Sequence, residues 1–213
     1  MYLTATRPDL MFVVCLVSRY VERPTGMHLA VVKRIFRYLR GTTKFGIMYR
    51  RGKEGTLIAY SDSDYAGDVN DRRSTSGYVF VLGSGAVSWS SKKQPVVTLS
   101  TIEAEFIAAA SCACQNVWLR RILEQVGHPQ LKPTTVYYDN NSTIKLSRNP
   151  VLHGRSKHID VRFHFLKDLC KDEVIKLVQC RSQEQISDIM TKHLMLESFS
   201  NFSSRLGMIK LYD

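Results

Sequence analysis

The chain has 213 residues, of which 44% are apolar and 23% charged, so it is long enough and apolar enough to bury a core of its own. Lys and Arg number 30 and Asp and Glu 19. The resulting net charge of +11 favours a polyanionic partner and excludes an acidic, disordered chain. No apolar stretch approaches about 18 residues, which excludes a membrane span, and the order of charges near the start is unlike a signal peptide.

The cysteines indicate a reducing compartment. Their number is odd, no two have Cys-x-x-Cys spacing, and they stand at Cys15, Cys112, Cys114, Cys170 and Cys180. This pattern argues against a disulfide framework and against a zinc knuckle. We therefore expect reduced thiols in a cytoplasmic or nuclear protein that is not secreted.

Residues 1–50 are expected to be mainly helical. Within residues 28–42, apolar side chains recur at helical spacing, basic side chains fall between them, and Gly41 follows where a helix would end. The pattern predicts a basic amphipathic helix. Its basic side chains form either a solvated face over a core stripe or a surface that contacts phosphates, and both interpretations stay open.

From residue 55 onward the pattern changes to strands. Three antiparallel strands are expected at 56–61, 78–82 and 86–90, followed by a long helix over 100–126 that Ser100 and Glu103 cap. A strand at 135–138, a short helix at 140–147, a helix at 156–170, a strand at 174–179 and a final helix at 182–194 follow, the last capped by Ser182 and Gln185. The order predicts an α/β fold in which helices flank a mixed five-stranded sheet. Trp118 and Tyr78 are expected in its core.

Acidic residues end two of the expected strands. Asp62 ends the first strand and Asp139 ends the fourth. Ligands of mixed α/β sheets gather outside strand ends, so these two carboxylates are expected to lie close together. Two bare carboxylates that close repel each other and stay ionised only if a cation lies between them.

Two further carboxylates complete a candidate set. Glu103 caps the long helix, which leaves Glu105 to face the strand ends, and Asp188 lies near the start of the final helix. Taken singly, Glu105 and Asp188 are better explained as solvated surface charges. Together the four form an all-oxygen set that favours Mg²⁺ or Mn²⁺ over zinc. Two such ions roughly 4 Å apart support in-line cleavage of a phosphodiester.

At these residues the sequence resembles the C-terminal part of the Pol polyprotein of copia-type retrotransposons, namely the tail of the reverse transcriptase followed by the ribonuclease H domain. The stretches that carry the resemblance are YLTATRPDLMF (2–12), HLAVVKRIFRYLRGT (28–42), YSDSDYAGDVNDRRSTSGYVF (60–80), SWSSKKQPVVTLSTIEAEF (88–106), VYYDNNSTIKLSRNPVLHGRSKHIDVRFHF (136–165) and QISDIMTK (185–192). They span nearly the whole chain, and they are specific in combination.

The resemblance implies a ribonuclease H-like fold with Asp62, Glu105, Asp139 and Asp188 as catalytic, metal-binding carboxylates. It also implies two Mg²⁺ ions, with Mn²⁺ as a substitute, and the RNA strand of an RNA–DNA hybrid as substrate, recognised by shape and 2′-hydroxyl groups. The expected organisation is a thumb- or connection-like reverse transcriptase segment over 1–54, a ribonuclease H-like domain over 55–195 and a C-terminal tail over 196–213. The polymerase palm of a longer Pol chain is a further expected partner.

The sequence departs from the family in two respects. It has no Tyr- or Phe-x-Asp-Asp hairpin, so we expect that this chain does not polymerise DNA by itself and is a truncated copy or a fragment. Many ribonucleases H carry a mobile His shortly before the last Asp, but residues 180–184 contain none. We therefore assign no proton-shuttling His and expect modest turnover.

Other polar residues have weaker claims to function. Asp64 is either a second carboxylate near the metal or an acceptor in a turn, and Asp68 and Asp71 are expected in Asx turns. The imidazoles of His153, His158 and His164 lack a recognised metal-binding frame and are expected to make hydrogen bonds within helices. The candidate contacts to nucleic acid are Lys92, Lys93, Asn140 and Arg73, although lysines at a strand edge are equally often just solvated.

Two hypotheses of different class follow. The first is an active, Mg²⁺-dependent ribonuclease H. The second is a degenerate, catalytically inactive protein derived from a retroelement that still binds nucleic acid, with an unpaired apolar face on residues 1–50.

Overall fold

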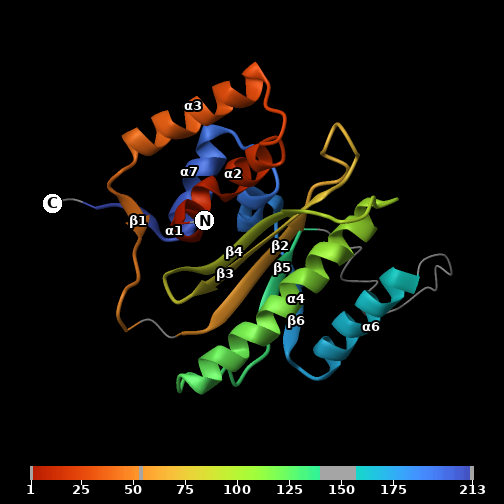
Figure 1. Cartoon of the computed structure of the whole chain (residues 1–213). Coiled ribbons are helices and arrows are strands. Elements are labelled where there is room, and N and C mark those ends of the chain that lie inside the picture. Colours follow the sequence, from red (N-terminus) through yellow and green to blue (C-terminus); the bar gives the residue numbers. More distant parts are fainter. Residues whose placement is uncertain (1, 53–54, 140–156, 212–213) are drawn as a thin grey trace.

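A mixed sheet of five strands organises the computed structural model, which describes residues 2–52, 55–139 and 157–211 (Figure 1). Its order is β4-β3-β2-β5-β6. The strands are β2 (Leu57–Ser63), β3 (Thr75–Leu82), β4 (Gly85–Lys93), β5 (Thr134–Tyr138) and β6 (Ile175–Gln179). The first three pair antiparallel, whereas β5 is parallel to both β2 and β6. The predicted α/β fold with a mixed five-stranded sheet flanked by helices is confirmed.

The register of the two central strands determines where the acidic residues lie. Tyr60 of β2 is the partner of Tyr137 of β5. Because these strands are parallel, Asp62 and Asp139, each two residues further on, reach the same end of the sheet. The strand order therefore brings together carboxylates that are 77 positions apart in the sequence.

Two helices cover one face of the sheet, namely α4 (Thr101–Gln125) and α6 (Lys157–Lys171) (Figure 1). Ser100 caps α4 by accepting a hydrogen bond from the amide of Glu103 at 3.1 Å, and the Glu103 carboxylate accepts one from the amide of Leu99 at 2.7 Å. The predicted cap by Ser100 and Glu103 is thus present. The apolar core on this face includes Phe80, Phe106, Ala109, Ala113, Val136 and Leu166. The prediction that Trp118 lies in the core is wrong, because its side chain is 54% exposed.

The other face is covered by the C-terminal part of the chain. Residues 182–194 form two short 3₁₀ helices, η2 (Ser182–Glu184) and η3 (Ile186–Met190), so the predicted final helix is wrong. Gln185, between them, has a non-helical ψ of 88°. All five residues of η3 are buried, whereas an α-helix at the edge of a domain exposes one face to solvent. The apolar core on this face includes Tyr60, Val79, Ile189, Met190, Phe202 and Leu206.

Residues 196–210, expected to be a tail, form α7 (Leu196–Arg205) and the short strand β7 (Met208–Lys210). Strand β7 pairs antiparallel with β1 (Phe45–Ile47) from the N-terminal segment. Gly207, at a φ of +84°, turns the chain into β7, and its Cα region packs against Gly85 at the β3–β4 turn. The two ends of the chain are therefore joined on one side of the sheet, whereas the domain boundaries at 54/55 and 195/196 remain predictions.

The N-terminal segment contains α1 (Tyr2–Thr6), η1 (Pro8–Leu10), α2 (Met11–Ser18) and α3 (Gly26–Gly41). A buried pair ties its parts together, because the Arg7 guanidinium donates to both carboxylate oxygens of Asp9 at 2.9 and 2.8 Å. Arg7 also donates to the carbonyl of Thr42 at 3.1 Å, and Tyr38 donates to Asp9 at 2.8 Å. Only Ile35 of α3 is buried, while Leu29 and Phe36 are 54% and 65% exposed.

Among the described residues, no helix combines the length and the apolar character needed to cross a bilayer. All five cysteines are free thiols.

Candidate metal centre

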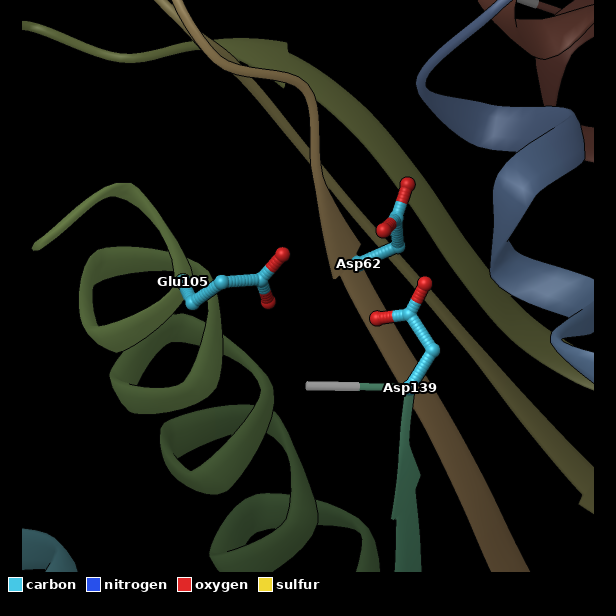
Figure 2. A group of neighbouring side chains, drawn as sticks. All are labelled: Asp62, Glu105 and Asp139. Atoms are coloured by element: carbon cyan, nitrogen blue, oxygen red, sulfur yellow. The ribbon is translucent and has the colours of Figure 1, made fainter. Parts of the chain in front are cut away.

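Three carboxylates from distant parts of the chain converge at one end of the sheet. Asp62 comes from β2, Glu105 from the second turn of α4, and Asp139 follows β5. Figure 2 shows their side chains pointing toward one another, and one ligand atom from each lies within 4.8 Å of those of the other two. The fold therefore brings together three of the four carboxylates singled out from the sequence.

The electrostatics of Glu105 fit a cation at this place. Its side chain is buried, and burial, followed by the charges of Asp62 and Asp139, raises its pKa well above the usual range. Its Oε2 atom is buried and has no hydrogen-bond partner among the described residues. A buried carboxylate that lies among two other carboxylates and has one oxygen without a partner suits a hard divalent cation, which prefers oxygen ligands.

Asp188, the fourth carboxylate, lies beside Asp62 and outside the 4.8 Å group. It belongs to η3, and its backbone carbonyl accepts hydrogen bonds from the amides of Thr191 and Lys192 at 3.2 and 3.1 Å. Burial, and then the charge of Asp62, raises the pKa of Asp188. The structure thus places all four carboxyl groups in one region, with Asp188 at its edge.

The turn after η3 provides two contacts that the sequence analysis did not anticipate. The Thr191 hydroxyl donates a hydrogen bond to Oδ2 of Asp62. The Lys192 ammonium lies 3.5 Å from the same Oδ2 and 3.1 Å from Oδ1 of Asp188. Burial alone would lower the pKa of Lys192, but the charges of Asp62 and Asp188 raise it. Its spacing of four residues from Asp188 was the only signal of this role in the sequence.

Two buried glutamines hold the backbone around the site, and neither was recognised as such from the sequence. Gln185 is fully buried, and its Nε2 atom donates to the carbonyl of Ser61 at 3.0 Å and to that of Tyr137 at 3.4 Å. Gln94 donates to the carbonyl of Ala104 at 2.9 Å and to the Ser76 hydroxyl at 2.8 Å. They therefore join the residues that flank Asp62, Asp139 and Glu105 to the rest of the sheet.

The sequence relatives include Pol polyproteins of transposons. Over 210 residues, which are 99% of the chain, it is 39% identical to the retrovirus-related Pol polyprotein from transposon RE1 of Arabidopsis thaliana. Over 206 residues, or 97% of the chain, it is 41% identical to the corresponding polyprotein from transposon TNT 1-94 of Nicotiana tabacum. Over nearly its whole length the chain is thus homologous to the Pol polyproteins of copia-type retrotransposons. It covers 14% and 15% of the length of these two relatives.

No protein-family model matches the chain. Among solved structures, it is similar to LC11-RNase H1 in complex with an RNA/DNA hybrid, at 14% identity and a TM-score of 0.47. That similarity covers 64% of the Pol chain and 94% of the solved chain.

The remaining acidic candidates of the Pol chain act in a loop. Asp64 accepts a hydrogen bond from the amide of Thr75, and burial raises its pKa. Asp64 is not part of the group that could hold an ion. Of the two alternatives, it acts as a hydrogen-bond acceptor in the turn. Asp68 accepts from the amide of Asn70 at 3.0 Å and Asp71 from that of Arg73 at 3.2 Å, which confirms both predicted Asx turns.

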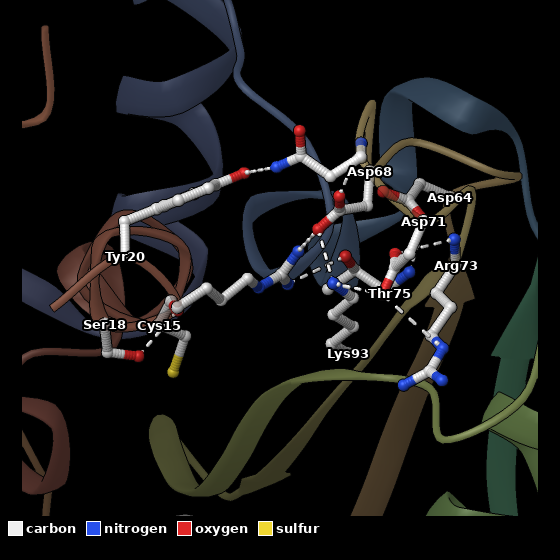
Figure 3. Close-up of polar contacts among 11 residues, drawn as sticks. Cys15, Ser18, Tyr20, Asp64, Asp68, Asp71, Arg73, Thr75 and Lys93 are labelled. Carbon is white, nitrogen blue, oxygen red and sulfur yellow. Dashed lines mark hydrogen bonds and ion pairs between the residues drawn. The ribbon is translucent and has the colours of Figure 1, made fainter. Parts of the chain in front are cut away.

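Of the residues expected to contact nucleic acid, two are engaged in this loop (Figure 3). The Lys93 ammonium lies 2.8 Å from Asp68 and 2.7 Å from Asp71, and Arg73 lies 3.5 Å from Asp71. Arg19 of the N-terminal segment also reaches Asp68, at 3.3 Å. Lys93 therefore joins the loop to β4.

Lys92 is exposed and, with Arg162, lines a groove of about 380 Å³ between the end of β4, α4 and α6. Asn140, His153 and the short helix expected at 140–147 lie outside the described residues, as does the side chain of His158, whereas His164 is exposed on α6.

Proposed function

We propose that this Pol chain is a divalent-cation-dependent ribonuclease H that hydrolyses the RNA strand of RNA–DNA hybrids. The observation that carries the proposal is the convergence of the buried Asp62, Glu105 and Asp139 side chains on one place. Such a group persists when a cation balances its charge. The family relationship and the net charge of +11 support nucleic acid as the substrate.

In this proposal, four carboxylates bind the metal ions and two neighbouring residues position them. Asp62, Glu105 and Asp139 would hold one Mg²⁺ or Mn²⁺ ion, and Asp188 would join Asp62 in holding a second. Bound ions supply an activated water and stabilise the leaving oxygen of a phosphodiester. Thr191 orients the Asp62 carboxylate by its hydrogen bond, and the buried Gln185 fixes the ends of both parallel strands.

The substrate backbone is proposed to follow the groove that Lys92 and Arg162 line. Lysine and arginine contacts to phosphates position a nucleic acid without reading its sequence. Asn140, next to Asp139, and Arg73 remain proposed contacts. Lys93 is a poorer candidate than Lys92, because two carboxylates already neutralise its charge.

Cleavage of a labelled RNA–DNA hybrid tests the proposal. We expect cutting of the RNA strand that requires Mg²⁺ or Mn²⁺ and ceases with a chelator. Asp62→Asn and Glu105→Gln should each reduce the rate by about a hundredfold or more, since even groups behind metal ligands contribute 10–100-fold. Asp172→Asn, at an exposed position after α6, is the control. Tight, salt-sensitive binding without metal-dependent cutting would instead identify an inactive nucleic-acid-binding protein.

We also propose that the polymerase part of a longer Pol chain covers the exposed side of α3. Leu29 and Phe36 lie seven positions apart, two helical turns, so they share a face, and both are more than half exposed. The relatives are about seven times as long as the region matched here. A titration with a recombinant polymerase region of such a polyprotein should show binding that Leu29→Glu with Phe36→Glu abolishes; unchanged binding would refute this contact.

A further inference from the structure

The loop over residues 64–74, the β2–β3 loop, follows directly on the strand that carries Asp62. It leaves β2 and returns to β3 at the end of the sheet where the three carboxylates converge (Figure 1). Arg72 in this loop is exposed, and the side chain of Arg73 is 41% exposed. Two adjacent arginines at this end of the sheet are suited to contact the phosphates of a nucleic acid that is bound at the carboxylates.

The backbone of the β2–β3 loop is strained. Ala66 and Arg72 have φ angles of +52° and +57°, in the left-handed region that residues with a side chain seldom adopt. Such a conformation costs free energy and persists where the surrounding structure holds it in place. The shape of the loop, and with it the position of Arg72, therefore depends on the contacts that the loop makes with other elements.

Several of these contacts come from the N-terminal segment. Arg19, directly after α2, donates to Oδ2 of Asp68 at 3.3 Å and to the Thr75 hydroxyl at 3.0 Å (Figure 3). It thus joins the middle of the loop to the start of β3. The neighbouring Tyr20 accepts a hydrogen bond from the side-chain amide of Asn70 at 3.2 Å. The N-terminal segment therefore holds the β2–β3 loop at three points.

Arg19 itself is poorly placed to bind a phosphate. Its side chain is only 13% exposed, and its guanidinium is directed to two acceptors of the loop and β3. The Asp68 side chain that it contacts is 1% exposed and also pairs with Lys93 at 2.8 Å. Any effect of Arg19 on a bound nucleic acid therefore passes through the β2–β3 loop.

We propose that Arg19 is a positioning residue through which the N-terminal segment holds Arg72 and Arg73 in place to bind the backbone of an RNA–DNA hybrid. The inference rests on the nucleic-acid substrate of the proposed function and gives the N-terminal segment a part in binding it. Without Arg19 the loop loses its shape, whereas Asp62 is still held by strand pairing and by Thr191. Loss of Arg19 therefore weakens hybrid binding more than it slows the cleavage of bound hybrid.

Fluorescence anisotropy of a labelled RNA–DNA hybrid, titrated with the full chain in the presence of a chelator, tests this without catalysis. Arg19→Met should weaken binding by about fivefold or more, as expected when a contact acts through a second element. Arg23→Met removes the same charge from an exposed position nearby and should weaken binding clearly less. The milder Arg19→Lys keeps the charge but lacks the planar fork that reaches two acceptors, so it should also bind more weakly than wild type.

Asp68→Asn separates positioning from a plain effect of charge. If only charge mattered, removing a carboxylate near the substrate would strengthen binding. If Arg19 positions the loop, Asp68→Asn should weaken binding, and adding Arg19→Met to it should have little further effect. In cleavage, Arg19→Met should raise KM with little change in kcat. Stronger binding by Asp68→Asn would overturn the proposal.

Hydrogen exchange provides a measurement that needs no nucleic acid. The amides of Asp68 and Arg72 donate within the loop at 3.2 and 2.9 Å, and they should exchange faster in Arg19→Met and Arg19→Lys while the strands keep their protection. Unaltered exchange, or equal hybrid affinities of wild type and both Arg19 variants, would overturn the role of Arg19 and leave the proposed nuclease intact. Absence of hybrid binding by wild type would overturn both.

Discussion

Gly77 is the register partner of Asp62 in the β2–β3 pair, and the segment that carries Thr191 packs directly against it. A Cβ atom at position 77 would lie 2.6 Å from Cβ of Met190 and 2.7 Å from Cγ2 of Thr191, closer than van der Waals contact allows. The missing side chain therefore lets η3 approach β3 until the Thr191 hydroxyl reaches Asp62.

Gly77→Ala is expected to push η3 away from the sheet. We expect a loss of about 1–3 kcal/mol in the free energy of unfolding, typical of an overpacked core, together with weaker hybrid cleavage. Urea denaturation measures the first effect. Gly41→Ala, at the end of α3 where a Cβ meets nothing within 4 Å, is the matched control. Equal stabilities of the two variants would show that η3 does not depend on Gly77.

Gln185→Leu should loosen the ends of β2 and β5 together. The change removes the donor to the carbonyls of Ser61 and Tyr137 inside a fully buried site, and each unsatisfied buried group costs about 1–3 kcal/mol. Denaturant unfolding should show this loss, and the Mn²⁺ affinity should fall because Asp62 and Asp139 are no longer held in register. Gln183→Leu, on exposed η2, should change neither quantity. A destabilised variant with unaltered Mn²⁺ affinity would limit Gln185 to a structural role.

Glu105→Gln is expected to stabilise the metal-free protein while abolishing cleavage. Burial and the charges of Asp62 and Asp139 raise the pKa of Glu105 above its unfolded value of about 4.3. The folded state then binds this proton more tightly than the unfolded state, so wild type loses stability as the pH rises above the unfolded value. The advantage of Glu105→Gln should therefore grow between about pH 5 and pH 8 and reach about 1 kcal/mol or more.

Unfolding by urea at several pH values, in the presence of a chelator, measures this difference. Glu197→Gln makes the same change on the exposed first turn of α7 and serves as control. A stability difference that stays constant over this range would mean that Glu105 is not held protonated by its neighbours.

Lys93→Met should destabilise the loop between β2 and β3. Burial alone would raise the pKa of Asp68, but the hydrogen bonds and charge of Lys93 and the Asn70 amide lower it to about 2. A lowered carboxyl pKa contributes stability above the unfolded value of about 3.9, which is lost as the pH falls toward 2. We expect Lys93→Met to cost about 1–2 kcal/mol near neutral pH, since the ammonium is partly exposed, and the difference to shrink in acid. Chemical denaturation of wild type and Lys93→Met near neutral pH and in acid tests this. A stability difference that does not shrink in acid would contradict it.

Lys92→Met should affect binding and leave the fold unchanged. Lys92 is exposed beside the groove that Arg162 also lines, so its loss removes about one phosphate contact. The affinity for an RNA–DNA hybrid should fall, and the slope of log affinity against log salt should decrease by about one. Electrophoretic mobility shifts over a range of salt concentrations measure the slope. Unaltered binding would place the substrate away from this groove.

The sheet and its long helix were predictable because their signals are local. Alternating strands, the Ser100 cap and the two aspartates at strand ends lie in short stretches of sequence, and pairing of β2 with β5 then brings Asp62 to Asp139. Residues 182–194 were predicted wrongly for a local reason as well. Apolar residues there recur at helical spacing, but the segment is buried on every side and bends at Gln185 to bond with two strands.

Residues that act through tertiary contacts had no such signal. Gln94, Gln185 and Thr191 are ordinary polar residues in the sequence, and their roles depend on backbone carbonyls or carboxylates more than nine positions away. Lys93 was expected on a nucleic-acid surface because the loop that neutralises it comes from residues 68–71, over 20 positions earlier. Trp118 is exposed although Leu119 and Leu123 of the same helix pack against the core, so it lies on the side of α4 that faces away from the sheet.

The pairing of β1 with β7 connects the N-terminal segment to the C-terminal end of the chain. The amide of Met48 donates to the carbonyl of Gly207 at 2.9 Å, and the amide of Leu211 donates to that of Lys44 at 2.8 Å. Hydrogen bonds just beyond both ends of the strand pair therefore extend the connection. A nuclease fragment excised at residue 195 would lack Phe202 and Leu206, which cover the face of the sheet behind Tyr60 and Val79. The N-terminal strand β1, α7 and β7 therefore contribute to the same apolar core on one face of the sheet, and we expect them to unfold together with it.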